Sequence, residues 1–88
     1  MNRVIWKYTL SPAILIKIPK GAQLLSVAEQ NNNICMWALV DPNADLEVRE
    51  FHIFGTGHDI TIKNLDFVGT ALLDNGSLVS HVFEFKQI

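Results

Sequence analysis

The sequence predicts a small single domain, residues 1–88, that is mainly β: a twisted antiparallel sheet, a sandwich or a small open barrel. Apolar residues recur at alternate positions along most of the chain, which places them on one face of extended segments. Clusters of Pro, Gly, Asn and Asp separate these segments at short intervals. No stretch has a 3.6-residue apolar period long enough for a helix. Many short strands in one small chain favour these three architectures.

The first two predicted strands carry their apolar residues at every second position. These are Val4, Trp6, Tyr8 and Leu10 in the first strand, and Ile14, Ile16 and Ile18 in the second. A turn is expected at Pro19-Lys20-Gly21, with Pro at its second position and Gly at its last. The chain then reverses into a strand over residues 23–29.

Asn31-Asn32-Asn33 predicts the next reversal, because asparagine tolerates the left-handed conformation that tight loops require. Residues 34–40 are apolar on both faces, which is typical of a central strand. The polar segment 41–45 ends this strand.

Apolar and polar residues alternate again over residues 48–54, where one face is expected to be exposed to solvent. That face carries Glu50 and His52, and the other carries Arg49, Phe51 and Ile53. Residues 59–66 fit a short strand and an irregular loop equally well, so they are left unassigned.

Residues 67–73 and 78–85 flank Asn75-Gly76, a strong signal for a hairpin with a two-residue type I′ turn. The resulting register places Thr70 opposite His81, Leu72 opposite Val79 and Val68 opposite Phe83. Thr70 and His81 then form either a buried hydrogen-bonded pair or the polar floor of a pocket.

Composition narrows the function classes. Hydrophobic residues make up 49% of the chain, which is high for so small a domain, so we expect a homo-oligomer rather than a monomer with an apolar exterior. The net charge is −2 and the basic residues are scattered, which argues against nucleic-acid binding. The N-terminal apolar stretch is interrupted too often for a signal peptide or a membrane span. The single cysteine, Cys35, lies in an apolar run, which fits a reduced thiol and a cytoplasmic location.

Catalysis, metals and cofactors are not expected. His52, His58 and His81 lack the spacing of metal ligands, and Cys35 lies where a thiol is inert. No nucleophile, base and orienting group can be assembled from these residues. Phosphodiesterase chemistry that uses His58 and His81 is the enzymatic alternative that stays open.

The tetrapeptide Gly55-Thr56-Gly57-His58 has two interpretations. Paired glycines can turn backbone N–H groups toward one point, and Thr and His add side-chain donors, as in an anion cradle. A third glycine and a following helix, which a dinucleotide fingerprint requires, are absent. The alternative is a turn that serves geometry alone.

Several short motifs together resemble a family of small phage and prophage proteins. They are Trp6-Lys7-Tyr8, Pro19-Lys20-Gly21-Ala22, Leu25-Ser26-Val27 with Gln30, Trp37-Ala38-Leu39-Val40-Asp41-Pro42, Gly55-Thr56-Gly57-His58, Val68-Gly69-Thr70, and Leu78-Val79 with His81-Val82-Phe83-Glu84. The resemblance implies a viral protein that acts in a bacterial host or is packed in a virion. By analogy with other small phage proteins, it implies a role against host defence.

The sequence therefore predicts a non-enzymatic binding protein of one of three kinds. It sequesters a small nucleotide signal, it covers a host protein, or it is a minor virion component. Sequestration would use backbone N–H groups, Thr and His for phosphate and aromatic rings for the base. The candidate ligand-binding residues are Gly55, Thr56, Gly57, His58, Thr70, His81, Trp6, Tyr8 and Trp37.

Overall fold

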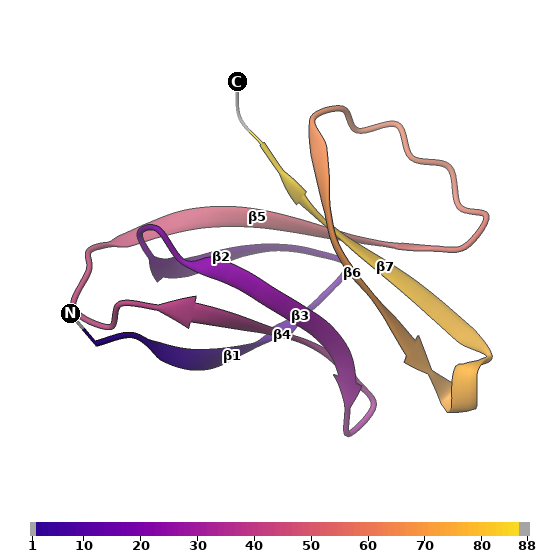
Figure 1. The fold of residues 1–88 in the computed structure, drawn as a ribbon. Coiled ribbons are helices and arrows are strands. Elements are labelled where there is room, and N and C mark those ends of the chain that lie inside the picture. The colour runs from indigo at the N-terminus through magenta and orange to yellow at the C-terminus, as the bar shows by residue number, and fades with distance from the viewer. Residues whose placement is uncertain (1, 87–88) are drawn as a thin grey trace.

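Seven antiparallel strands form two sheets in the computed structural model, which describes residues 2–86 (Figure 1). The strands are β1 (Val4–Leu10), β2 (Ala13–Pro19), β3 (Gln23–Gln30), β4 (Asn33–Val40), β5 (Leu46–Gly55), β6 (Leu65–Leu73) and β7 (Leu78–Phe85), with a 3₁₀ turn at Asp74–Gly76. The three-stranded sheet has the order β1-β4-β3, and the four-stranded sheet has the order β2-β5-β7-β6. Neither sheet closes into a barrel, so the predicted β class is confirmed as the sandwich.

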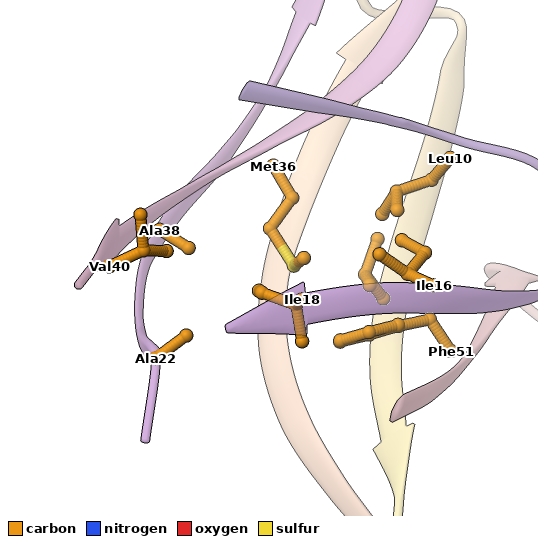
Figure 2. Packing of buried hydrophobic residues seen from close by; sticks show 9 residues of the cluster. Leu10, Ile16, Ile18, Ala22, Met36, Ala38, Val40 and Phe51 are labelled. Carbon is orange, nitrogen blue, oxygen red and sulfur yellow. The ribbon is translucent and has the colours of Figure 1, made fainter. Parts of the chain in front are cut away.

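The core lies between the inner faces of the two sheets (Figure 2). Met36 of β4 points toward Ile18 of β2 (Figure 2), and both side chains are buried, as are those of Ile16 and Ala38. Phe51 of β5 is fully buried, as the alternation over residues 48–54 predicts. Each sheet thus buries one apolar face against the other, and this burial is the main contribution to the stability of the domain.

The turn after β2 differs from the prediction in its position. The N–H of Ala22 donates to the carbonyl oxygen of Pro19 at 3.2 Å, and Gly21 has φ of +79°. The turn is therefore one residue later than expected, because a type II turn needs positive φ at its third position, where Gly21 lies. The chain does reverse here, but β2 pairs with β5 and β3 pairs with β4. The turn joins two sheets and is not a hairpin.

The asparagine reversal and the central strand are confirmed. Asn31 and Asn32 have φ of 53° and 65°, and Gln30 pairs with Asn33 across a two-residue loop. Strand β4 lies between β1 and β3. Met36 and Ala38 on its inner face and Cys35 on the opposite face are all buried, which is why its sequence is apolar on both faces.

The final hairpin keeps most of its predicted register. Thr70 lies opposite His81 and Leu72 lies opposite Val79, as predicted. The loop is longer than the predicted two-residue turn, since Leu73 and Leu78 form the last pair. Two residues are added symmetrically, so the register beyond the loop is unchanged.

The same hairpin contains a bulge that the prediction missed. The register shifts between Phe67 and Gly69, which places Phe67, not Val68, opposite Phe83. The neighbouring sheet gives the physical reason. A Cβ on Gly69 would lie 2.9 Å from Cβ of Val27 in β3, so β6 runs unusually close to β3 at this point.

A buried ion pair ties the turn after β2 to the four-stranded sheet. Arg49 of β5 donates from Nε and Nη2 to the two carboxylate oxygens of Glu84 in β7, at 2.5 and 2.8 Å. Its Nη1 donates to the carbonyl oxygen of Ala22 at 2.8 Å. Burial alone would raise the pKa of Glu84, but the hydrogen bonds and charge of Arg49, with Lys86, hold the pKa below its usual value.

Residues 56–64 contain no strand, and β6 begins at Leu65. The segment 59–66, which the sequence left unassigned, is therefore irregular as far as residue 64 and belongs to β6 after it. This segment lies at the opposite end of the molecule from the N-terminus (Figure 1). Over residues 2–86, no helix has the length and apolar character that crossing a membrane requires.

Candidate functional site

The tetrapeptide Gly55-Thr56-Gly57-His58 forms a tight turn at the end of β5. The N–H of His58 donates to the carbonyl oxygen of Gly55 at 3.2 Å, and Gly57 has φ of +88°. The N–H of Gly55 donates to Nδ1 of His58 at 3.1 Å, so this ring nitrogen is the acceptor. Two of the backbone donors that an anion cradle would use are therefore occupied inside the turn.

Thr56, His81 and Thr70 form a hydrogen-bonded row across β7. Oγ1 of Thr56 lies 2.8 Å from Nε2 of His81, and Oγ1 of Thr70 lies 3.1 Å from its Nδ1. Thr70 is exposed and His81 is half-buried. Thr70 and His81 are thus hydrogen-bonded to each other, but on the surface and not in the core.

The turn histidine and this row lie on opposite faces of the four-stranded sheet. His81 pairs directly with Phe54, so their side chains share one face, whereas Gly55 pairs with Ser80 and faces the other side. A Cβ on Gly55 would lie 2.7 Å from Cε1 of His58, so the imidazole of His58 covers the side of Gly55 that faces inward. The structure brings the hydroxyls of Thr56 and Thr70 to His81 on the outer face and places the imidazole of His58 on the other face.

An open hollow of about 520 Å³ lies beside His58. Its lining consists of Pro12, Ile53, Gly55, Thr56, His58, Ser77, Leu78, Val79 and Ser80. These residues supply hydroxyl groups and one imidazole but no Lys, Arg, Asp or Glu. Any ligand there would be held by hydrogen bonds and apolar contact, without an ion pair.

The three candidate aromatic residues belong to the three-stranded sheet. Trp6 and Tyr8 lie on its inner face, opposite Ala38 and Met36, and Trp37 lies on its outer face between Lys7 and Ser26. Burial raises the pKa of the Tyr8 hydroxyl. None of the three lines the hollow beside His58. The structure therefore does not gather the nine candidate residues into one site.

A feature absent from the sequence predictions is an apolar outer face on the four-stranded sheet. Its residues, defined by the pairing of the strands, are Leu15, Lys17, Val48, Glu50, His52, Phe54, Leu65, Phe67, Thr70, Leu72, Val79, His81, Phe83 and Phe85. Leu15 is 66% exposed, Phe67 is 61% exposed and Leu72 is 59% exposed. We call this surface the aromatic face.

Aromatic rings run in sequence across the aromatic face. The ring of His52 stacks on Phe54 with centroids 6.3 Å apart, and Phe54 meets Phe83 edge-on at 5.9 Å. Phe83 meets Phe67 edge-on at 5.5 Å. Such contacts fix ring orientation and leave large apolar areas in water. The sequence does contain a signal for this face. Leu15, Phe83 and Phe85 are apolar although they lie at the strand positions that alternate with the core-facing ones.

Few charged groups interrupt the aromatic face. Glu50 lies 2.6 Å from Nε2 of His52, and Lys17 is the basic residue on the same face. No group of three or more His, Cys, Asp or Glu side chains that could hold a metal ion occurs within the described part of the chain. The aromatic face thus offers apolar contact and hydrogen bonding.

Comparison with known proteins gives a family but no described function. No curated protein matches the chain, and no solved structure matches it. A family model described as a domain of unknown function, DUF7352, matches residues 1–87, which is nearly the whole chain. The chain therefore belongs to the DUF7352 family.

Proposed function

We propose that this protein is a non-enzymatic binding protein that covers part of another protein with its aromatic face. The observation that carries this proposal is the exposure of Leu15, Phe67 and Leu72 on one continuous sheet surface. Soluble monomers rarely expose contiguous apolar patches of more than a few hundred Å² without an interaction role. Aromatic residues are also enriched in protein interfaces.

The size of the aromatic face suits a small interface. Four strands at the usual spacing, with seven or more residues each, give a footprint of roughly 500 Å². A specific interface needs about 500 Å² from each partner. The accessible surface of the chain, 5830 Å², also exceeds the value of about 5,200 Å² expected for a monomer of its mass.

The chemistry of the face indicates the class of partner. The opposed charges of Lys17 and Glu50 leave the face nearly neutral, so the partner surface is apolar and carries little net charge. The row Thr56–His81–Thr70 would meet hydrogen-bonding groups on the partner. The resemblance to phage and prophage proteins makes a host defence protein in the bacterial cytoplasm the proposed partner.

A single lysine on the aromatic face should abolish capture of the partner. Leu15→Lys places an ammonium group within the interface, where its desolvation is unfavourable, and we expect binding to weaken at least tenfold. Leu25→Lys, at an exposed position in the three-stranded sheet, is the matched control. Wild type and both variants would be immobilised and exposed to host lysate. Equal recovery of the same protein by all three would contradict the proposal.

A second candidate function is sequestration of a small anionic nucleotide in the hollow beside His58. It is favoured by the hydroxyl groups and imidazole in the lining of that hollow. A phosphate there would accept hydrogen bonds from His58, and from Thr56 once its hydroxyl turns away from His81, without a Lys or Arg partner. The absence of basic groups from the lining makes this the weaker of the two candidates.

Calorimetry against cyclic dinucleotides and ADP-ribose-type molecules tests this second candidate. If it is correct, His58→Ala or Thr56→Ala should weaken binding roughly tenfold, the cost of one hydrogen bond to a charged group. Leu15→Lys, on the far side of the sheet, should not change the affinity. Failure of every nucleotide to bind wild type would remove sequestration and leave the protein-binding proposal intact.

A further inference from the structure

Strand β1 is an edge strand that lacks the usual protection against pairing with another chain. Its partner in the three-stranded sheet is β4, and its other edge pairs with no described strand. Val4, Ile5 and Trp6 are 41%, 59% and 39% exposed. An exposed apolar edge strand presents unpaired backbone N–H and C=O groups that favour the addition of a further strand.

The other three edge strands each carry a protective feature. Strand β3 has a bulge at Leu25, and β6 has a bulge at Val68. These two strands also lie side by side, where Gly69 meets Val27. Strand β2 ends in Pro19, which has no N–H to donate, and its outer face carries Lys17. Bulges, prolines and lysines are established means of blocking edge-to-edge pairing.

The one charged side chain in β1 does not guard its edge. Nζ of Lys7 donates to Oε1 of Gln30 in β3 at 2.6 Å, so this side chain extends across the outer face of the sheet and away from the free edge. The strand has no proline and no bulge in its pairing with β4. The free edge of β1 is therefore open to a partner strand.

We propose that two copies of this chain pair through β1, antiparallel and about a two-fold axis at Trp6, to join their three-stranded sheets into one six-stranded sheet. An antiparallel strand is the geometry that two identical edges can form with closed symmetry. Core-facing residues must stay on one side of the joined sheet, so each residue opposes one on the same face.

Charge selects the register among those that this condition allows. Pairing centred on Lys7 would oppose two lysines, and pairing centred on Ile5 would oppose Lys7 to Arg3. Like charges directly opposite one another are destabilising. Pairing centred on Trp6 opposes Ile5 to Lys7 of the second copy and the two Trp6 rings to each other. Pairing centred on Tyr8 also lacks a repulsive pair, but it leaves the exposed Val4 and Ile5 outside the paired region. Pairing centred on Trp6 covers them, so it is the register that we propose.

This inference goes beyond the proposed function and also bears on it. A two-fold axis perpendicular to the joined sheet keeps the same layer of both copies on the same side. The two aromatic faces would then lie side by side, which doubles the surface available to one partner. Dimerisation through β1 leaves both aromatic faces free.

Charge variants at Ile5 test the pairing and its register. A strand-edge interface is small and weak, so the dimer needs a high protein concentration. Sedimentation velocity at about 100 µM should show a dimer for wild type. Ile5→Lys opposes two lysines across the interface and should weaken association at least tenfold, whereas Ile5→Glu opposes a carboxylate to Lys7 and should retain the dimer. The double variant Ile5→Lys/Lys7→Glu should restore it. Circular dichroism would verify that each variant is folded.

Self-crosslinking gives a second readout. In a Cys35→Ala background, Trp6→Cys should form an intermolecular disulfide on mild oxidation, because directly opposed Cα atoms lie about 4.5–5.5 Å apart. Ile5→Cys should crosslink far more slowly. A monomeric wild type, equal dimerisation of Ile5→Lys and Ile5→Glu, or dissociation by Leu15→Lys instead would each overturn the proposal. A monomeric wild type or equal dimerisation of the two Ile5 variants would not contradict the proposed protein-binding function.

Discussion

Replacing Glu84 with glutamine is expected to lower the free energy of unfolding by about 3–5 kcal/mol, the cost of removing one partner from a buried ion pair. Glu84 is 5% exposed and accepts hydrogen bonds from both Nε and Nη2 of Arg49. Glutamine is nearly isosteric with glutamate, but it cannot neutralise the guanidinium. Arg49 would then lose the carboxylate to which it donates, and Glu47 would be the acidic group that still acts on its charge.

Urea unfolding at neutral pH measures this loss. Glu50→Gln is the matched control, because Glu50 lies on the aromatic face of the same sheet and contacts His52 near the surface. Its effect should be below about 1 kcal/mol. The double variant Arg49→Met/Glu84→Leu should be more stable than Glu84→Gln, since it removes both charges. A loss of under about 1 kcal/mol in Glu84→Gln would show that the pair is solvated.

The Arg49–Glu84 pair also gives the stability a definite dependence on pH. The folded pKa of Glu84 lies below the ordinary value of 4.5, so the unfolded chain binds a proton more readily. The stabilisation is therefore present above about pH 4.5 and is lost as the pH falls through the folded pKa. Acid should reduce the stability of wild type more steeply than that of Glu84→Gln.

Local patterns in the sequence predicted the strands because period-two alternation and asparagine turns are local properties. Asn31 and Asn32 adopt left-handed conformations as expected, and Phe51 is buried as its alternation indicates. The pairing of β2 with β5 could not be predicted, because the alternation in β2 shows which side chains face the core and not which strand lies beside it. The register of the final hairpin was predicted next to its loop, because the loop is symmetric about Asn75-Gly76, but not beyond the bulge at Val68, which depends on Val27 in another strand.

The candidate site was less predictable because it depends on contacts between distant residues. His58 and His81 both follow from plausible motifs, yet strand alternation places them on opposite sides of one sheet. Glu84 has no sequence feature that distinguishes it from a surface acid, and its burial depends on Arg49, 35 residues away. The aromatic face arises because β6 and β7 pair beside β5 and bring Phe67, Phe83 and Phe54 together.

Replacing Gly69 with valine is expected to lower the free energy of unfolding by about 3 kcal/mol, the upper part of the range for overpacking. A Cβ at this position would lie 2.9 Å from Cβ and 3.1 Å from Cγ2 of Val27, and 3.5 Å from its backbone nitrogen. Neither strand can yield easily, because Val27 packs against the core and pairs with Met36. Strand propensity alone predicts the opposite result, because valine favours a strand more than glycine does and would raise the free energy of unfolding.

The effect should depend on Val27 alone, and a double-mutant cycle tests this dependence. In a Val27→Gly background the nearest side-chain atoms are absent, so Gly69→Val should cost much less than in wild type. Thr70→Val, at the exposed neighbouring position, is the control and should change stability by under about 1 kcal/mol. An equal penalty for Gly69→Val in both backgrounds would mean that the close approach of β3 and β6 does not set the bulge at Val68. A small penalty in wild type would mean that the two sheets can separate at this point, and the inner side of the sandwich would then be open beside β6.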